Sequence, residues 1–299
     1  MAEHEGEPGP VVIGFDGSAA GADALTLGTW FAGALGVNAV VAVVHPGPAT
    51  ISPARVDAEW VADRHRLAEE ILDEARELLG GTDVVIGYRA VASPSAAHGL
   101  HDLVEELDAS IVVVGSRSTG EQERLFAGST ADRLLSGSTC PVAVAPSGIR
   151  GRELAPLGTV GVAYIDAAEA RGALAFAVTL ARRAGARLRA YTVVPGEAEV
   201  MPMLIGSEPD QAYVEMARES YGGALDAALA ALPPELGATG EVLTGDTVDT
   251  LAELGPPEVD VLVCGSRGYG PARRVLLGGV SARLVRQARG PVIVVPRED

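Results

Sequence analysis

Residues 112–118 read VVVGSRS, and residues 261–268 read VLVCGSRG. In each stretch a run of apolar residues leads into a glycine, Gly115 or Gly265. Short apolar runs that end in turn-forming residues are typical of the buried strands of a parallel sheet. We therefore expect each stretch to be a strand followed by a glycine-containing loop.

The two stretches belong to a longer repeat. Gly115 and Gly265 are 150 residues apart, and Gly128 and Gly278 have the same separation. Each copy then ends in an apolar run after a proline, PVAVA in the first and PVIVV in the second. Because solenoid repeats are only about 20–50 residues long, this spacing indicates a duplicated domain. A chain of 299 residues accommodates two domains of ordinary size.

Around these strands, apolar runs alternate with segments of helical periodicity. We expect strands at 11–15, 37–44, 84–86, 111–114 and 142–145, and again at 159–164, 188–194, 241–243, 259–264 and 292–295. We expect helices at 19–35, 67–78, 97–107, 130–135, 168–184 and 214–232. Apolar strands that alternate with helices form parallel sheets covered on both faces. The predicted fold is α/β, with two tandem, doubly wound (Rossmann-like) domains at 9–147 and 157–297, each with a five-stranded parallel sheet.

The composition argues against several classes of protein. A net charge of −17 disfavours sequence-independent binding of nucleic acid, which needs a basic surface. No apolar run reaches the roughly 18 residues of a membrane span, and the acidic start lacks the order of a signal peptide. Cys140 and Cys264 stand at non-equivalent places in the two copies, which excludes a repeated disulfide or metal framework. We expect a cytoplasmic protein.

All 23 basic residues are arginines. Without lysine the chain has no Walker-A lysine, no protein-kinase lysine and no Schiff-base lysine. Any phosphate group would have to be held by backbone N–H groups, hydroxyls, arginine or a metal ion. No G-x-S-x-G motif and no base–nucleophile pair is evident, so we expect no enzymatic activity.

The expected binding site lies beyond the carboxyl ends of the strands, where the strand order of an open parallel sheet reverses. In the first copy that edge carries Asp16, Val44 and Gly115, while Gly128-Ser129 opens a predicted helix. A helix N-terminus offers unpaired N–H groups and a partial positive charge, which suits a phosphate. Gly115 and Gly128 lack a Cβ atom, so a polyphosphate chain could approach the backbone closely.

The chain resembles the universal stress protein family, as a tandem of two such domains. The nucleotide signature of that family is G-x2-G-x9-G-[ST]. In the first copy Gly115, Gly128 and Ser129 match the signature, and Ser118 stands where the second glycine belongs.

In the second copy the match falls at different positions of the same signature. Gly265, Gly268 and Gly278 match the three glycines, and Gly279 replaces the final hydroxyl residue. Each copy therefore departs from the family pattern at one place.

The family also has an acidic residue after the first strand, where it hydrogen-bonds the adenine. Asp16 fills that place in the first copy, and alignment of the Ala-Leu pairs that follow puts Ile165 opposite it in the second. Asp166 comes one residue later, and successive strand residues face opposite sides, so it need not face the same crevice. We expect the first copy to be the better nucleotide site.

The resemblance implies an ATP-binding, regulatory stress-response protein without rapid catalysis. It implies ATP as the cofactor, with Mg²⁺ as a further candidate, and a homodimer that binds neither nucleic acid nor membrane. The residues that it assigns to nucleotide binding are Gly14, Phe15, Asp16, Val44, Val114, Gly115, Ser118, Gly128, Ser129, Thr130, Gly265, Arg267, Gly268, Gly278 and Gly279.

Structural roles compete with binding for several of these residues. Ser129 could cap its helix, with Asp132 completing a capping box. Asp16 could serve the turn through a side-chain bond to the backbone. Gly115 and Gly265 could serve only the tight turn after each strand.

If those structural roles explain the pattern, the alternative function is a dimerisation or scaffold protein of the same fold. Its closing strands, 142–145 and 292–295, would then pair with each other or with another chain, because exposed sheet edges tend to be covered. His98 and His101 are three residues apart on a predicted helix and could share a metal. The sequence places no third ligand, so we expect no metal site.

Overall fold

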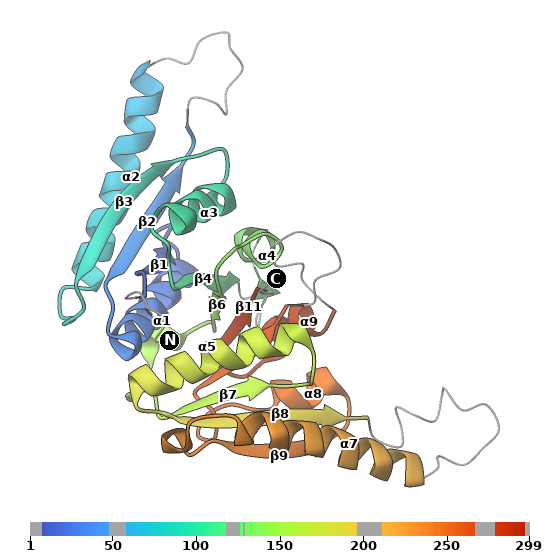
Figure 1. The fold of residues 1–299 in the computed structure, drawn as a ribbon. Coiled ribbons are helices and arrows are strands. Elements are labelled where there is room, and N and C mark those ends of the chain that lie inside the picture. Colours follow the sequence, from blue (N-terminus) through green and yellow to red (C-terminus); the bar gives the residue numbers. More distant parts are fainter. Residues whose placement is uncertain are drawn as a thin grey trace. The chain divides into compact units, whose positions relative to one another are not determined.

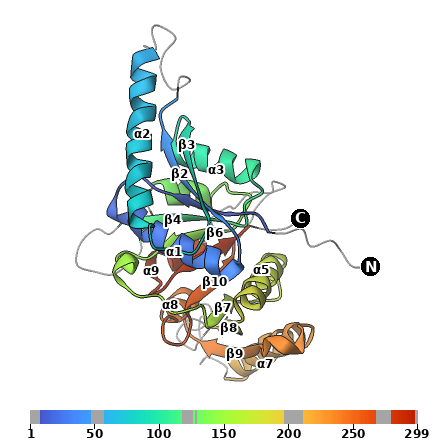
Figure 2. The same ribbon diagram turned by 90° about the vertical axis from the view of Figure 1, so that its left-hand side faces the viewer.

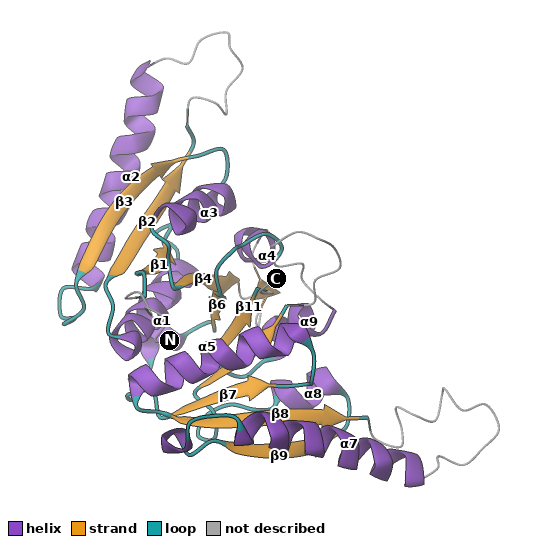
Figure 3. Cartoon of the chain, in the orientation of Figure 1, coloured by secondary structure: helices purple, strands orange, loops and turns teal. Residues whose placement is uncertain are grey.

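The computed structural model describes residues 8–47, 58–117, 126–127, 129–195, 211–266 and 279–296. The chain divides into two compact units, with the boundary between Leu154 and Ala155. In each unit strands and helices alternate along the chain (Figure 1 and Figure 3). The duplicated sequence thus folds into two α/β domains.

The first unit contains a parallel sheet with the strand order β3-β2-β1-β4-β6. These strands are β1 (Val11–Gly14), β2 (Ala39–His45), β3 (Ile86–Ala92), β4 (Ile111–Arg117) and β6 (Val142–Ala145). A short strand, β5 (Phe126–Ala127), pairs antiparallel with the end of β4. The strand order reverses between β1 and β4, so the ligand crevice of a doubly wound sheet belongs beside the ends of these two strands.

The helices of the first unit cover both faces of its sheet. They are α1 (Ala19–Leu35), α2 (Ala58–Leu78), α3 (Ala96–Glu106) and α4 (Ser129–Leu135), with a 3₁₀ turn, η2 (Ile149–Gly151), after the last strand. Helices α1 and α2 pack on one face, and α3 and α4 pack on the other. Figure 2 shows α2 and α3 on opposite sides of β2 and β3. Right-handed crossovers between parallel strands produce this arrangement.

The second unit repeats the topology with the strand order β9-β8-β7-β10-β11. Its strands are β7 (Thr159–Ala163), β8 (Arg187–Val194), β9 (Thr239–Thr244), β10 (Val261–Gly265) and β11 (Val292–Val295). Its helices are α5 (Ala168–Ala184), α7 (Gln211–Ala230), α8 (Thr247–Ala252) and α9 (Gly279–Gln287), with a 3₁₀ turn, η4 (Pro234–Leu236). The predicted fold class is confirmed in both units.

The corresponding helices α1 and α5 end alike but begin differently. Each stops at a glycine in the left-handed region, Gly36 with φ 68° and Gly185 with φ 65°, where other residues would be strained. Ser18 caps the start of α1 by accepting a hydrogen bond from the N–H of Gly21, whereas Ala167 gives α5 no side-chain cap. The two helices therefore differ in their N-terminal caps, which lie at the carboxyl ends of β1 and β7, where a ligand would bind.

The prediction for the third strand was wrong in position. The apolar residues Val84 and Val85 precede β3, and Val85 is 67% exposed. Within the first unit β3 pairs only with β2, so it is that unit's edge strand, and its residues alternate between exposed and half-buried. An edge strand of this kind carries polar residues such as Arg89 and lacks the continuous apolar run used to find it.

Two helices of the second unit were missed in the sequence. Helix α8 has only six residues, too few for a periodic pattern, and Asp246 caps it by accepting from the N–H groups of Val248 and Asp249. Helix α9 begins at Gly279, a residue that reads as a loop.

No helix among the described residues is long and apolar enough to cross a membrane.

Two glycines of α1 give a test of how closely this helix packs on the sheet. A Cβ at Gly28 would overlap the side chain of Ile13 in β1, whereas a Cβ at the exposed Gly33 would come no nearer than 3.9 Å to Val84. We expect Gly28→Ala to lower the free energy of unfolding by about 1–3 kcal/mol through overpacking. Gly33→Ala, the matched control, should raise it by up to about 1 kcal/mol through helix propensity. Urea denaturation measures both, and equal effects would contradict the close packing.

Candidate functional site

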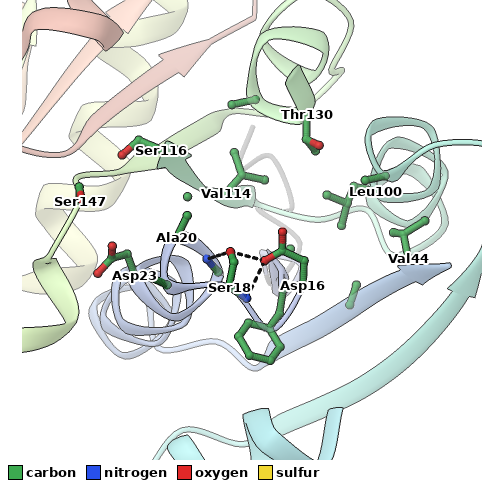
Figure 4. A pocket seen from close by; sticks show the side chains of 18 of the residues that line it. Asp16, Ser18, Ala20, Asp23, Val44, Leu100, Val114, Ser116, Thr130 and Ser147 are labelled. Atoms are coloured by element: carbon green, nitrogen blue, oxygen red, sulfur yellow. Dashed lines mark hydrogen bonds between the residues drawn. The ribbon is translucent and has the colours of Figure 1, made fainter. Parts of the chain in front are cut away.

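A cavity of about 450 Å³ opens at the carboxyl ends of β1, β2 and β4 in the first unit (Figure 4). The first turn of α1, the helix α3 and the start of α4 also contribute residues to its lining. Its lining residues are Gly14, Phe15, Asp16, Ser18, Ala19, Ala20, Gly21, Asp23, Ala42, Val44, Ala96, Leu100, Val114, Gly115, Ser116, Thr130, Ala131, Ser147 and Arg150. A pocket of this size is in the range of small-molecule sites.

One side of the cavity is apolar. Val44, Leu100 and Val114 line it from β2, α3 and β4 (Figure 4). Gly14 lies between Leu100 and Val114. A Cβ atom at Gly14 would come within 2.9 Å of Leu100 Cδ1 and 3.3 Å of Val114 Cγ1. The glycine therefore lets the end of β1 approach α3 and β4. This wall suits a flat apolar group such as a heterocyclic base.

Asp16 forms the turn between β1 and α1. Its Oδ1 accepts hydrogen bonds from the backbone N–H of Ser18 at 3.1 Å and from the Ser18 hydroxyl at 2.5 Å. Ser18 Oγ in turn accepts from the N–H of Gly21 at 3.1 Å. The turn role foreseen for Asp16 is therefore real. Its Oδ2 forms no hydrogen bond with any described residue, so one carboxylate oxygen remains for a ligand (Figure 4).

The turn foreseen at Gly115 was wrong, because β4 continues to Arg117 and Gly115 pairs with Ala145 inside the sheet. Packing requires the glycine instead. A Cβ at this position would overlap the carbonyl group of Ala20, in the first turn of α1. The close approach foreseen for a polyphosphate is thus already made by the backbone of α1. Next to it, Ser116 is only 2% exposed, lines the cavity, and its Oγ has no hydrogen-bond partner among the described residues. A buried hydroxyl without a partner is costly, and a polar ligand group could satisfy it.

Asp23, a buried carboxylate in the wall of the cavity, was missed in the sequence. Asp23 is 1% exposed and accepts from the N–H groups of Gly148 and Arg150 at 2.9 and 3.0 Å. The Arg150 guanidinium donates to the same carboxylate at 2.8 Å and to the Ala19 carbonyl at 3.1 Å. This contact fixes η2 against α1 and brings an arginine to the cavity. An aspartate within the apolar face of a predicted helix was the available signal.

Seven of the residues assigned to nucleotide binding in the first copy line this one cavity. They are Gly14, Phe15, Asp16, Val44, Val114, Gly115 and Thr130. Ser118 and Gly128 lie outside the described residues. Ser129 is the first residue of α4, one position earlier than the predicted start of this helix.

In the second copy, the structure describes two of the residues assigned to nucleotide binding, Gly265 and Gly279. Gly265 lines a separate cavity in the second unit, whereas Gly279, the exposed first residue of α9, does not line it. Arg267, Gly268 and Gly278 lie outside the described residues.

Strand pairing shows which residue of the second unit replaces Asp16. Val11 pairs with Ile111, and Val160 pairs with Val261, so β1 and β7 hold the same register against their central neighbours. Counting five residues from Val11 and from Val160 leads to Asp16 and to Ile165. As the sequence alignment predicted, the second unit has an isoleucine there.

The histidines have partners of their own. His98 Nε2 lies 3.6 Å from a carboxylate oxygen of Asp102, and His101 Nε2 lies 2.9 Å from the carbonyl oxygen of Gly137. In the part of the chain that the structure describes, no three histidine, cysteine or acidic residues gather as a metal site. His45, at the end of β2, is buried against His65 with 3.4 Å between ring nitrogens.

Both cysteines are free and buried. Burial raises the pKa of the Cys140 thiol to about 11, so it stays protonated near neutral pH. Cys140 is a core residue.

Comparison with known proteins finds similarity over nearly the whole chain. The model of the universal stress protein family matches residues 9–146 and 157–296. Universal stress protein Rv2319c of Mycobacterium tuberculosis (strain ATCC 25618 / H37Rv) is 30% identical over 296 residues, which are 96% of this chain and 99% of that protein.

Solved structures share the fold. The crystal structure of a universal stress protein from Archaeoglobus fulgidus DSM 4304 has a TM-score of 0.66 and 18% identity, covering 97% of this chain and 98% of that one. The functionally unknown protein PA1789 from Pseudomonas aeruginosa PAO1 has a TM-score of 0.58 and 13% identity, covering 96% and 92%.

The Asp23 contact predicts a large loss of stability on substitution. Asp23→Ala removes the acceptor of two backbone N–H groups and of Arg150, all at a buried position. We expect the free energy of unfolding to fall by about 2–4 kcal/mol, the cost of leaving such groups unpaired. Asp102→Ala, which removes an exposed partner of His98, is the control and should change it by less than about 0.5 kcal/mol. Thermal and urea denaturation measure both, and similar losses would contradict the role given to Asp23.

Proposed function

Because the chain belongs to the universal stress protein family, we propose that the cavity of its first unit binds ATP. One observation carries the proposal above all. Residues from three distant parts of the sequence, Asp16, Gly115 and Arg150, line one cavity together with an apolar wall. A base, a sugar and a phosphate chain need that combination of surfaces within a single pocket.

The base would lie against Val44, Leu100 and Val114. Asp16 Oδ2 has no protein donor among the described residues. It could accept a hydrogen bond from the amino group of adenine. The turn holds the other oxygen of Asp16, which fixes the direction of the carboxylate before the ligand arrives. Preorganisation of this kind favours binding because less side-chain freedom is lost.

The phosphates would be held without lysine. Ala19 and Ala20, the first residues of α1, line the cavity, and the N-terminus of this 17-residue helix carries a partial positive charge. Arg150 uses one guanidinium nitrogen, Nη1, on Asp23 and Ala19, which leaves other N–H donors. Ser116 and Thr130 add hydroxyls. We also assign Ser118, Gly128 and Ser129 to this end, and Mg²⁺ would accompany the phosphates.

We propose a regulatory role in the stress response, in the cytoplasm and as a homodimer, rather than rapid catalysis. Bound ATP would bridge the strand ends, α1 and η2 of the first unit. Bound ATP can shift the protein between two conformations only as far as its affinities for these conformations differ. A multiple-turnover rate of ATP hydrolysis well above background would contradict the non-catalytic part of the proposal.

A scaffold function without nucleotide is the second candidate. It is favoured by the structural roles of two of the residues assigned to nucleotide binding. Asp16 forms a turn, and Gly115 allows close packing of α1. Light scattering separates the candidates. Self-association that is unchanged by ATP, in a protein that retains no nucleotide, would favour the scaffold.

Replacement of Asp16 by asparagine tests the base contact with little disturbance of the turn. The amide oxygen of Asn can still accept from Ser18, while the amide nitrogen takes the place of the free oxygen and accepts nothing. We expect Asp16→Asn to weaken ATP binding about 10- to 100-fold, the value of a hydrogen bond to a charged group. Titration calorimetry with Mg²⁺ present measures this affinity, and thermal denaturation checks that the fold is kept.

Asp166→Asn is the matched control in the second unit. Asp166 is exposed, does not line either cavity, and pairs with Arg171 at 3.0 Å. ATP affinity should be unchanged by this substitution. Equal affinities of the wild-type protein and Asp16→Asn would refute the proposed base contact, and no binding by the wild-type protein would refute the nucleotide site.

A further inference from the structure

The second unit has a cavity of its own, of about 530 Å³, at the carboxyl ends of β7, β8 and β10. Its lining residues are Ala163, Tyr164, Ile165, Ala167, Ala170, Tyr191, Val193, Pro195, Tyr221, Thr247, Leu251, Cys264, Gly265, Val280 and Ser281. None of these described residues is charged. The cavity of the first unit has three charged lining residues, Asp16, Asp23 and Arg150.

The two cavities occupy equivalent places, so they can be compared residue by residue. Gly14 pairs with Ala42 as Ala163 pairs with Tyr191, and Ser18 and Ala167 are the corresponding N-caps. Thr130 and Val280 are the second residues of corresponding helices. The exchanges from the first unit to the second are Asp16 to Ile165, Ser18 to Ala167, Ala42 to Tyr191 and Thr130 to Val280. At three of these positions a polar or charged side chain is replaced by an aliphatic one.

The nearby charges are engaged outside the cavity. Asp166 pairs with Arg171 on the surface, with side chains 58% and 68% exposed, and neither residue lines the cavity. Asp23 has a glycine, Gly172, at its counterpart in α5, so that carboxylate is missing, and no arginine is among the described residues that line the cavity. A triphosphate would find neither the carboxylate for its base nor a described cation for its phosphates.

The second cavity is lined by three tyrosine rings, and only Tyr164 has an aromatic counterpart, Phe15, in the first cavity. Tyr164 follows β7, Tyr191 lies in β8, and Tyr221 is contributed by α7, although its counterpart α2 contributes no residue to the cavity of the first unit. Tyr191 is 2% exposed, and its hydroxyl has no hydrogen-bond partner among the described residues. Tyrosine rings offer large apolar contact area together with a polar end.

We propose that the cavity of the second unit binds an uncharged aromatic molecule that carries a hydroxyl or carbonyl group. The apolar residues and tyrosine rings would cover the faces of such a molecule. Its polar group could pair with a tyrosine hydroxyl or with Thr247. A charged ligand would lose its hydration without gaining an ion pair from any of the described lining residues. The volume is within the usual range for small-molecule sites.

Binding of 2-naphthol to the full-length protein tests the proposal by titration calorimetry near neutral pH, where this compound is uncharged. We expect saturable binding of one molecule per chain. Val280→Trp fills the cavity from the start of α9 and should weaken 2-naphthol binding at least 10-fold while ATP affinity stays unchanged. The matched variant Thr130→Trp should weaken ATP binding and leave 2-naphthol affinity unchanged.

A second variant keeps the test valid if Val280→Trp does not fold. Ile165 is 42% exposed, so Ile165→Asp should fold, and its new carboxylate should weaken 2-naphthol binding at least 5-fold. Absence of 2-naphthol binding, or binding that Val280→Trp and Ile165→Asp both leave unchanged, would overturn the proposal. ATP binding that Val280→Trp abolishes would overturn it as well. Because the first unit is tested by Asp16→Asn, failure of one site is distinguishable from failure of the other.

Discussion

The contact between the first turn of α1 and the end of β4 determines the shape of the site. Gly115 has room for no Cβ because the carbonyl of Ala20 lies against it. This contact places the start of α1 against the end of β4, and the Asp16 turn and the Asp23 hydrogen bonds lie in the same part of the chain. A signature glycine can therefore be required by packing and still line a binding cavity, because both depend on the same close approach.

The two units show how a duplicated frame can hold different sites. The central strands are fixed by burial on both faces, and β6 and β11 are buried along their whole length. Residues beyond the strand ends contribute less to that core, so they can differ without changing the register. The exchange of Asp16 for Ile165 alters the chemistry of the cavity in this way. Inside the strands, the exchange of Ala42 for Tyr191 also alters the cavity and leaves the strand pairing intact.

The sequence revealed the fold because its signals were local. Apolar runs such as 111–114 predict buried strands, and the spacing of Gly115 and Gly265 reveals the duplication. β3 was misplaced because an edge strand lacks that run, and α8 was missed because it is short. The Asp23–Arg150 contact joins residues 127 positions apart, and only the folded chain shows it. The replacement of Asp16 by Ile165 was predictable from alignment alone, whereas the tyrosine lining of the second cavity was not.

The charges of the first cavity constrain how it could hold a triphosphate. Asp16 and Asp23 contribute two negative charges and Arg150 one positive charge, so the described lining residues are net negative. The chain as a whole has a charge of −17 and no lysine. Side-chain charge therefore does not attract the phosphates, and long-range attraction is absent. If the cavity binds ATP as proposed, binding would depend on directed donors, namely the N–H groups at the start of α1 and the free N–H groups of Arg150, and on contacts of the base. Mg²⁺ on the phosphates would reduce the repulsion from Asp16 and Asp23.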